Sequence, residues 1–451
     1  MNTNDTKYNA CPDEKWGRIL DSTASAIRRM APAGTEFRME LTENLRNDME
    51  MRDGEIEKLK RATTRTLNVD IFIDGREGFF ITSHLQEDAI EQLVRDTIAT
   101  TQLLEPDEAN QLADPSRYYK GGGIDLNHCD ETLLNDSPEE KMNILRTHHQ
   151  QTQGLDARII SARTVYMDNV HQYAMLTSNG FYGSDAISKA EVSCILTMEG
   201  NDGQHPMEGW GETRLRRREL PMTGIAQLAL ERTARMIGQR PAPSGTYDMI
   251  VESSVADQLL MPVLTALNGM RLHTGTSFMR DWLDRPFASP VLNLVDDPLI
   301  PNTRGACHFE QDGTATQRRA IFEDGHLRTF FIDTPSSIRL GMAPTTEGIH
   351  HLLMQQGDAG LDGLIAQSRR AIVVTSFNGG NCDPVTGQFS YGVEGLLVEN
   401  GAVVHPISGM NVSGTMHDLW QSLVATANDA DPYEVNLLPS LLFRDVAFGG
   451  N

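Results

Sequence analysis

Tight-turn dipeptides between runs of strand-forming residues constrain the fold of this chain most. Asp74-Gly75 separates Leu-Asn-Val-Asp-Ile-Phe-Ile at 67–73 from Arg-Glu-Gly-Phe-Phe-Ile-Thr at 76–82. Asp and Gly tolerate the positive φ that a two-residue hairpin turn requires, so the pattern predicts two antiparallel strands. The same arrangement recurs in three further places: Asp53-Gly54, Asp324-Gly325 and Asn400-Gly401. Much of the chain is therefore expected to be antiparallel sheet.

Helices are predicted between these strands. Apolar residues at helical spacing indicate helices over 16–30 and 87–104. Ser137-Pro138-Glu139-Glu140 is typical of an N-cap, a first-turn proline and acidic residues at the positive end of a helix dipole, and this helix runs toward residue 152. Another helix covers 223–237. Because strands and helices do not alternate regularly, the α+β class is favoured over a doubly wound parallel sheet.

The length of 451 residues exceeds what one hydrophobic core usually supports, so two domains are expected. Gln-Arg-Pro-Ala-Pro-Ser-Gly at 239–245 is typical of a linker. We expect a mixed N-terminal α+β domain over 1–238. A C-terminal domain over 246–451, rich in antiparallel, barrel-like sheet, is expected to follow.

Composition excludes several classes of function. The formal net charge of −23 disfavours direct binding to nucleic acid, which requires a positive surface. Neither a signal peptide nor an apolar run of membrane-spanning length is present, so we expect a cytoplasmic protein without a membrane partner. The five cysteines never form Cys-x-x-Cys, which favours isolated reduced thiols over disulfides or a zinc knuckle.

Sequence motifs for cofactors are also missing. The chain lacks Gly-Lys-Ser/Thr, so a Walker-type phosphate loop is excluded. No histidine is followed by glutamate, and no two of the thirteen histidines are three to five positions apart, as zinc ligands on a helix would be. A ligand set assembled from distant histidines remains an alternative.

A glycine-rich stretch at 378–392, Asn-Gly-Gly-Asn-Cys-Asp-Pro-Val-Thr-Gly-Gln-Phe-Ser-Tyr-Gly, lies between two apolar runs. Its glycines do not follow the spacing of a dinucleotide-binding loop. Cys382 has no histidine or basic residue near it in sequence to lower its pKa, although spatial neighbours could make it reactive. A set of tight turns, a loop with a reactive Cys382, and a backbone surface on which another molecule docks are the readings that remain.

Together with the segments that follow it, this stretch resembles a known family. Residues 378–395, Leu-Leu-Val-Glu-Asn-Gly at 396–401 and Val-His-Pro-Ile-Ser at 404–408 closely resemble the signature of the TldD/PmbA family, in its PmbA (TldE) branch. Met-Arg-Asp-Gly-Glu-Ile-Glu-Lys at 51–58 and Ala-Ser-Pro-Val-Leu-Asn-Leu-Val-Asp-Asp-Pro at 288–298 match other parts of it in the same order. The resemblance runs from about residue 15 to residue 451.

The resemblance implies a cytosolic peptidase system built from two homologous chains. In that family the TldD-type chain carries His-Glu-x-x-x-His on a helix and a late cysteine as zinc ligands, and the PmbA-type chain pairs with it around a chamber for unfolded peptides. An older name calls such proteins modulators of DNA gyrase. A two-fold dimer is expected, and the chain studied alone could form a homodimer in place of the heterodimer.

The catalytic pattern itself is absent at the corresponding positions. Met261, Pro262 and Ala266 stand where active relatives carry the zinc helix, and none of these side chains can replace an imidazole or a carboxylate. The late cysteine also has no counterpart, since the last cysteine is Cys382. No cofactor is therefore expected in this chain, and zinc is expected in a TldD-like partner.

The sequence thus favours a non-catalytic subunit that helps to enclose peptides. Its predicted contact residues, lining a peptide groove or the subunit interface, are Asn378, Gly379, Gly380, Asn381, Cys382, Phe389 and Tyr391. Two alternatives stay open. One is a metallopeptidase active by itself through unconventional ligands, and the other is a regulatory binding protein, such as a gyrase modulator, that has no peptidase partner.

Overall fold

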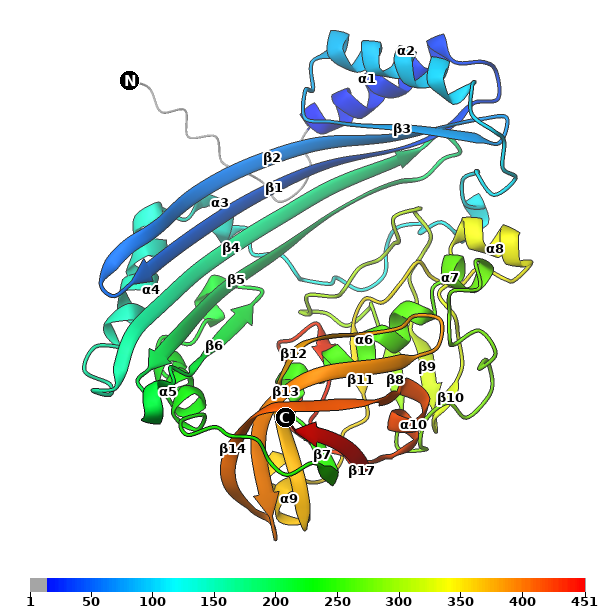
Figure 1. The fold of residues 1–451 in the computed structure, drawn as a ribbon. Helices are drawn as coiled ribbons and strands as arrows, with labels where there is room; N and C mark the ends of the chain where they lie inside the picture. Colours follow the sequence, from blue (N-terminus) through cyan, green and yellow to red (C-terminus); the bar gives the residue numbers. More distant parts are fainter. Residues whose placement is uncertain (1–13, 451) are drawn as a thin grey trace.

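The computed structural model describes residues 14–450, and its first half is built on one long antiparallel sheet (Figure 1). The strand order is β3-β2-β1-β4-β5-β6, and every neighbouring pair is antiparallel. The strands are β1 (Glu36–Arg52), β2 (Glu55–Ile73), β3 (Arg76–Thr82), β4 (Ile159–Thr177), β5 (Tyr182–Met198) and β6 (Met207–Arg214). Four of these strands are 17 or 19 residues long, which gives the sheet its extended, curved shape.

The predicted hairpin turns are confirmed. Asp74 has a φ of 49° and Gly75 a φ of 74°, so both central residues lie in the left-handed region that such a turn requires. Asp53-Gly54, Asp324-Gly325 and Asn400-Gly401 have the same conformation. They join β1 to β2, β9 (Arg319–Glu323) to β10 (His326–Leu327) and β13 (Gln388–Glu399) to β14 (Ala402–Thr415).

Helices cover one face of the long sheet in two groups (Figure 1). At one end α1 (Glu14–Met30) and α2 (Glu87–Thr101) pack on β1, β2 and β3. At the other end α3 (Thr132–Asn135), α4 (Pro138–Gln150) and α5 (Ile225–Ala234) pack on β4 and β5. Helix α4 begins as predicted, because Ser137 and Glu140 form a reciprocal capping box. The opposite face of the sheet carries no helix.

Within the apolar core formed with α3, α4 and α5, the covered face contains a buried ion pair. Lys141 of α4 and Asp168 of β4 are only 2% and 1% exposed, and Nζ lies 2.8 Å from Oδ2. Tyr166 donates its hydroxyl hydrogen to the same carboxylate at 2.8 Å, and Asn47 donates to its other oxygen at 2.7 Å. The carboxylate is therefore fully engaged, as a buried charge requires.

The second half is organised around a closed β-barrel. Strands β14-β13-β12-β7-β17 follow one another, and β17 also pairs with β14, which closes the ring. The additional members are β7 (Gly245–Val251), β12 (Arg370–Cys382) and β17 (Leu441–Gly450), while β15 (Leu423–Thr426) pairs only with β17. Helix α6 (Asp257–Ala266) contributes its apolar side to the same core. The barrel-like prediction is thus confirmed.

A smaller sheet and short helices complete this half. The sheet has the order β10-β9-β8-β11-β16, with β8 (Leu294–Asp296), β11 (Leu352–Met354) and β16 (Asn436–Leu437). The helices are α7 (Gly269–His273), α8 (Thr334–Leu340), α9 (Leu361–Ala366) and α10 (Met416–Gln421). In residues 14–450 no helix is long and apolar enough to cross a bilayer.

The predicted linker lies between α5 and β7, where residues 239–244 form neither helix nor strand. Cysteines 129, 194, 307 and 382 are free, as predicted for reduced thiols. Cys11 lies outside the described residues. We propose that residues 239–245 separate two folding units, one built on the long sheet and one on the barrel.

Candidate functional site

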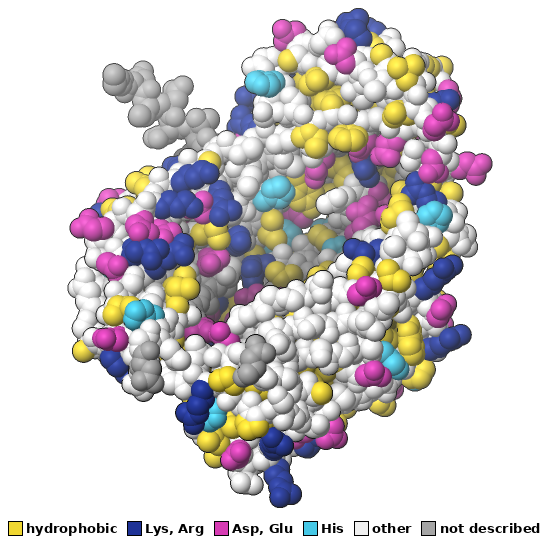
Figure 2. Space-filling view, in the orientation of Figure 1, with side chains coloured by type: hydrophobic (Ala, Val, Ile, Leu, Met, Phe, Trp, Pro, Cys, Tyr) yellow, Lys and Arg dark blue, Asp and Glu magenta, His cyan; other side chains and the backbone are white. Residues whose placement is uncertain are grey.

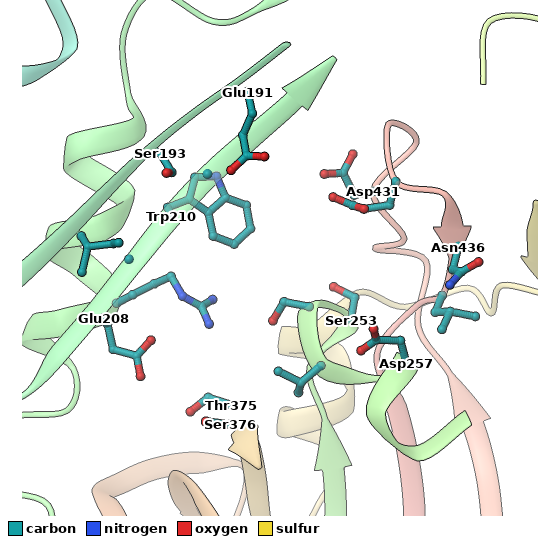
Figure 3. A pocket seen from close by; sticks show the side chains of 18 of the residues that line it. Glu191, Ser193, Glu208, Trp210, Ser253, Asp257, Thr375, Ser376, Asp431 and Asn436 are labelled. Carbon is teal, nitrogen blue, oxygen red and sulfur yellow. The ribbon is translucent and has the colours of Figure 1, made fainter. Parts of the chain in front are cut away.

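A deep cleft lies between the open face of the long sheet and the barrel half of the molecule (Figure 2). One pocket in this cleft has a volume of about 620 Å³. The pocket is bounded by β5 and β6 on one side, and by the start of α6, the middle of β12 and the loop before β16 on the other (Figure 3). The side chains labelled there are Glu191, Ser193, Glu208, Trp210, Ser253, Asp257, Thr375, Ser376, Asp431 and Asn436.

The sheet side of the pocket ends in β6, an edge strand of the long sheet. Gly209 and Gly211 flank Trp210 on this strand, and both lie close to β5. A Cβ added at Gly209 would lie 2.7 Å from the carbonyl oxygen of Cys194, and one at Gly211 would lie 2.9 Å from Ser193 Cβ. The two glycines therefore let β6 lie close to β5 at this side of the pocket, with Trp210 as the large side chain between them.

The opposite side is formed partly by the loop that precedes β16. Tyr433 of this loop stacks on Arg214 of β6, with the guanidinium carbon 3.5 Å from the ring centroid. Arg304 forms an ion pair with Glu434 at 2.7 Å and donates to the backbone oxygen of Tyr433 at 3.0 Å. The loop thus connects the long sheet to the barrel half along one rim of the pocket.

The pocket is acidic. Burial raises the pKa of Glu208, and the nearby Arg232 and Arg235 only partly offset this effect. Burial also raises the pKa of Asp257, and the charge of Glu434 acts in the same direction. Among the described residues that line the pocket, Arg232 is the only basic one. The charge of Arg232 is already engaged, because it forms an ion pair with Glu252 at 3.2 Å, and Arg235 pairs with the same carboxylate at 2.7 Å.

Helix α6 begins at this pocket, and it carries the positions of the predicted degenerate zinc helix. Met261 and Pro262 lie on its partly exposed side, whereas Ala266 is 1% exposed and packs in the barrel core. Zinc is held in proteins by imidazole, thiolate or carboxylate, and none of the three side chains supplies such a group. Within residues 14–450, no group of three or more His, Cys, Asp and Glu side chains is placed to hold a metal ion. The described side chains therefore do not fit a zinc centre.

The glycine-rich stretch forms the outer part of the β12–β13 hairpin. Thr375 and Ser376 line the pocket, and the strand continues from them into Asn378, Gly379, Gly380 and Asn381, which are exposed. The strand register slips between Asn378 and Asn381. This half of the predicted contact surface therefore begins at the rim of the pocket.

The remaining predicted residues, Cys382, Phe389 and Tyr391, are partly or fully buried. Phe389 is 5% exposed and stacks on Tyr391, with centroids 5.5 Å apart. A Cβ at Gly380 would lie 1.9 Å from the carbonyl oxygen of Ser390, so this glycine is needed for close approach of the two strands. Burial raises the pKa of the Cys382 thiol to about 11, and Asp383 acts in the same direction. Cys382 therefore lacks the environment of a reactive thiolate.

A second acidic group closes the far end of the cleft and was not found from the sequence. Arg38 of β1 forms an ion pair with Asp70 of β2 at 2.9 Å. Burial raises the pKa of Glu347 to about 7, the charges of Asp312 and Glu310 add to this, and Arg38 opposes it. Arg38, Glu77, Asp312 and Glu347 line a pocket of about 300 Å³ between the long sheet and the barrel half.

His350 connects two buried carboxylates next to this group. Its Nδ1 lies 3.0 Å from Asp296 Oδ2, and its Nε2 lies 3.1 Å from Glu310 Oε2. Burial alone lowers the pKa of His350, but the hydrogen bonds that it makes with Asp296, Cys307 and Glu310 raise this pKa to about 12. With both ring nitrogens protonated, the imidazolium has no lone pair to offer a metal ion. The sequence showed only a pair of adjacent histidines.

Three family models match the chain in order. The first domain of the PmbA/TldA metallopeptidases matches residues 41–100, the central domain matches 131–237, and the C-terminal domain matches 244–450. The chain therefore belongs to the PmbA/TldA metallopeptidase family, in agreement with the resemblance noted in its sequence.

Individual relatives agree with this assignment. A solved structure of a Bacteroides thetaiotaomicron protein, named as a candidate modulator of DNA gyrase, is 37% identical with a TM-score of 0.94, and the match covers 97% of this chain and 100% of that one. The metalloprotease PmbA homolog of Haemophilus influenzae is 23% identical over 96% of both chains. TldE from Thermococcus kodakarensis, at 17% identity, a TM-score of 0.83 and coverage of 96% and 100%, shows the same fold.

Proposed function

We propose that this chain is a PmbA/TldE-type subunit that does not hydrolyse peptides itself. In this proposal it pairs with a TldD-like homologous subunit, which supplies the zinc centre, and its own cleft receives part of an unfolded peptide. The substrates would be unfolded peptides or small proteins in the cytoplasm.

One observation carries the proposal: α6 begins at the pocket with Asp257, and it carries the half-buried Met261 and Pro262 at the positions predicted for a zinc helix. A zinc peptidase needs ligands that hold the ion and a carboxylate that takes a proton from bound water. Pro262 also cannot donate a backbone hydrogen bond within the helix. At these positions α6 thus lacks the groups that hold zinc and activate water.

The pocket beside α6 supports the peptide-binding part of the proposal. β6 is an edge strand, and the exposed residues Asn378–Asn381 continue from the pocket rim. Edge strands and irregular strand ends offer main-chain groups that can hydrogen-bond an extended peptide without reading its sequence. We keep the predicted contact surface at residues 378–391 within this proposal, as a peptide groove or a subunit contact.

The test is purification of the chain alone and together with a TldD-like subunit that carries His-Glu-x-x-x-His. We expect stoichiometric zinc and chelator-sensitive cleavage of an unfolded peptide only in the mixed complex. Stoichiometric metal with turnover in this chain alone would establish the self-sufficient metallopeptidase instead. A stable complex with gyrase or another protein, lacking any peptidase subunit, would establish the regulatory alternative.

A second measurement addresses the contact surface. A photo-crosslinking amino acid at Asn381 is expected to label the peptide or the partner subunit in the mixed complex. The matched control is the same amino acid at Arg95, which is exposed on α2 and belongs to the helix-covered face. Labelling from the control position alone would remove residues 378–391 from the proposal.

A further inference from the structure

The outer half of β2 is an open strand edge. β2 pairs with β1 from Glu55 to Phe72, but β3 pairs with it only from Leu67 onward. Among the described residues, 55–66 therefore have a paired strand on one side only. At about 3.3 Å per residue, this open edge is roughly 40 Å long.

Nothing in the described part of the chain covers this edge. Most side chains of residues 55–66 are exposed, including two large apolar ones, Ile56 at 48% and Leu59 at 62%. For residues 55–65, the described backbone hydrogen bonds all go to β1. Long open edges are uncommon in stable proteins because they attract other strands.

The edge also differs from the rest of the molecule in charge. Residues 55–66 carry four basic side chains, Lys58, Lys60, Arg61 and Arg65, against Glu55 and Glu57, in a chain whose net charge is −23. Figure 2 shows Lys and Arg side chains gathered on this side of the long sheet. The edge is thus a local basic surface on an acidic protein.

Two of these four cations lie within ion-pair distance of a described acid. Lys58 lies 3.7 Å from Asp48, and Arg65 is paired with Glu43. Lys60 and Arg61 form no ion pair with any described residue. They are adjacent in the strand, so they point to opposite faces of the sheet. Each face of the open edge therefore has one cation outside ion-pair distance of an acid, although Lys60 lies opposite Asp48 in the strand register and its charge acts on that carboxylate.

We propose that this edge binds an extended, acidic segment of another protein, which joins the long sheet as an additional strand beside β2. Main-chain hydrogen bonds would hold the segment, and Lys60 and Arg61 would select acidic side chains on its two faces. Ile56 and Leu59 would pack against its apolar side chains. The inference does not depend on the zinc question, because it uses a different surface from the α6 pocket.

The test uses fluorescent ten-residue peptides that alternate Thr or Val with Glu. We expect the acidic peptide to bind the full chain, and a peptide with Lys in place of every Glu to bind at least about tenfold more weakly. A peptide of the same charge, N-methylated at alternate residues, is also expected to bind about tenfold more weakly, since several main-chain hydrogen bonds are lost. Equal binding of the N-methylated peptide would overturn strand addition.

Charge reversal at the edge provides the second arm. Lys60→Glu with Arg61→Glu is expected to weaken the acidic peptide about tenfold and to strengthen the basic one. The matched control is Arg95→Glu with Arg369→Glu, which changes the net charge equally at exposed sites away from the edge. Equal weakening by both double variants, or tighter binding of single-stranded DNA than of the peptide, would show a non-specific polyanion effect and overturn the proposal.

Hydrogen exchange locates the contact. On addition of the acidic peptide, amides within residues 55–66 are expected to become protected, while those of residues 67–73, already paired with β3, stay unchanged. Protection confined to β6 or to the α6 pocket would place the peptide elsewhere and overturn the assignment.

Discussion

β4 of the long sheet buries every second side chain over most of its length, whereas β12 of the barrel buries every side chain from Ala371 to Thr375. In β4 the alternation follows from a sheet with one covered and one open face. In β12 one set of side chains fills the barrel, and the other packs outside it with Leu364 of α9 and Met236.

This difference in burial suggests different roles for the barrel and the long sheet. The barrel has its strands paired in a ring, so it is a rigid support that presents α6 and the β12–β13 hairpin to the cleft. The long sheet has an open face and open edges at β2 and β6, which leaves it free to contact other molecules. We therefore expect substitutions in the barrel to act on folding, and those on the open face to act on binding.

The largest expected effect breaks the barrel. In Gly395→Ala the new Cβ would lie 1.8 Å from the carbonyl oxygen of Val373. We expect a loss of more than about 4 kcal/mol in the free energy of unfolding, or no folded protein. The control is Gly449→Ala, also in the barrel, where nothing lies within 4 Å of the new Cβ. Urea denaturation of both variants measures the difference, and similar stabilities would contradict the tight strand contact.

The next effect concerns the polar contact inside the long sheet. Asp168→Ala leaves the buried Lys141 ammonium without its counter-charge, with the backbone oxygen of Leu133 as a remaining acceptor, and we expect a loss of about 3–5 kcal/mol in the free energy of unfolding. Replacing both residues by apolar ones, Asp168→Leu with Lys141→Met, is expected to recover most of this stability. If the double variant is as unstable as the single one, hydrogen bonds with Tyr166 and Asn47 dominate and not the unpaired charge.

A smaller effect on stability, which depends on pH, is expected from Glu347 at the far end of the cleft. The pKa of Glu347 is raised to about 7 in the folded protein, from about 4.5 in the unfolded chain. The favourable contribution of this residue to the free energy of unfolding is therefore complete below about pH 4.5, and it is lost as the pH rises through about 7. Glu347→Gln is therefore expected to be more stable than the original protein by about 1–2 kcal/mol at pH 8, and not at pH 4. Thermal unfolding at both pH values measures this. A variant that is less stable at pH 8 would contradict the sign.

The smallest effect concerns the hairpin that leaves the barrel. Because the pKa of Cys382 is raised to about 11, a variant that retains only this cysteine should react with iodoacetamide at pH 7.5 on the order of 100-fold more slowly than free glutathione. Asp383→Asn is expected to increase the rate modestly. Reaction as fast as that of glutathione would reopen the reactive-thiol alternative.

The features of this fold that could be predicted are those determined by a few neighbouring residues in the sequence. The Asx-Gly turns and the capping box at Ser137 are set by a few adjacent residues, and they formed as predicted. Helix α2 ends at Thr101, before the predicted residue 104, and Leu103 is 85% exposed because the apolar periodicity had already ended.

The pocket was not predictable in the same way. Glu208, Asp257 and Glu434 come from β6, α6 and a late loop, and only the tertiary fold brings them to one pocket. The hydrogen bonds of His350 with Asp296 and Glu310 likewise join segments that are far apart in the sequence. The Gly209-Trp210-Gly211 pattern was a local signal available in the sequence, since glycines around an aromatic residue indicate a close strand approach.

The position of β17 has a consequence for how the molecule is made. This strand lies between β7 and β14, so the ring stays open until residue 450 has been synthesised. At about 5–20 residues per second, β7 would leave the ribosome roughly ten seconds or more before its last neighbour. During that interval a nascent chain exposes unpaired, strongly apolar strands, and it would depend on chaperones to prevent aggregation.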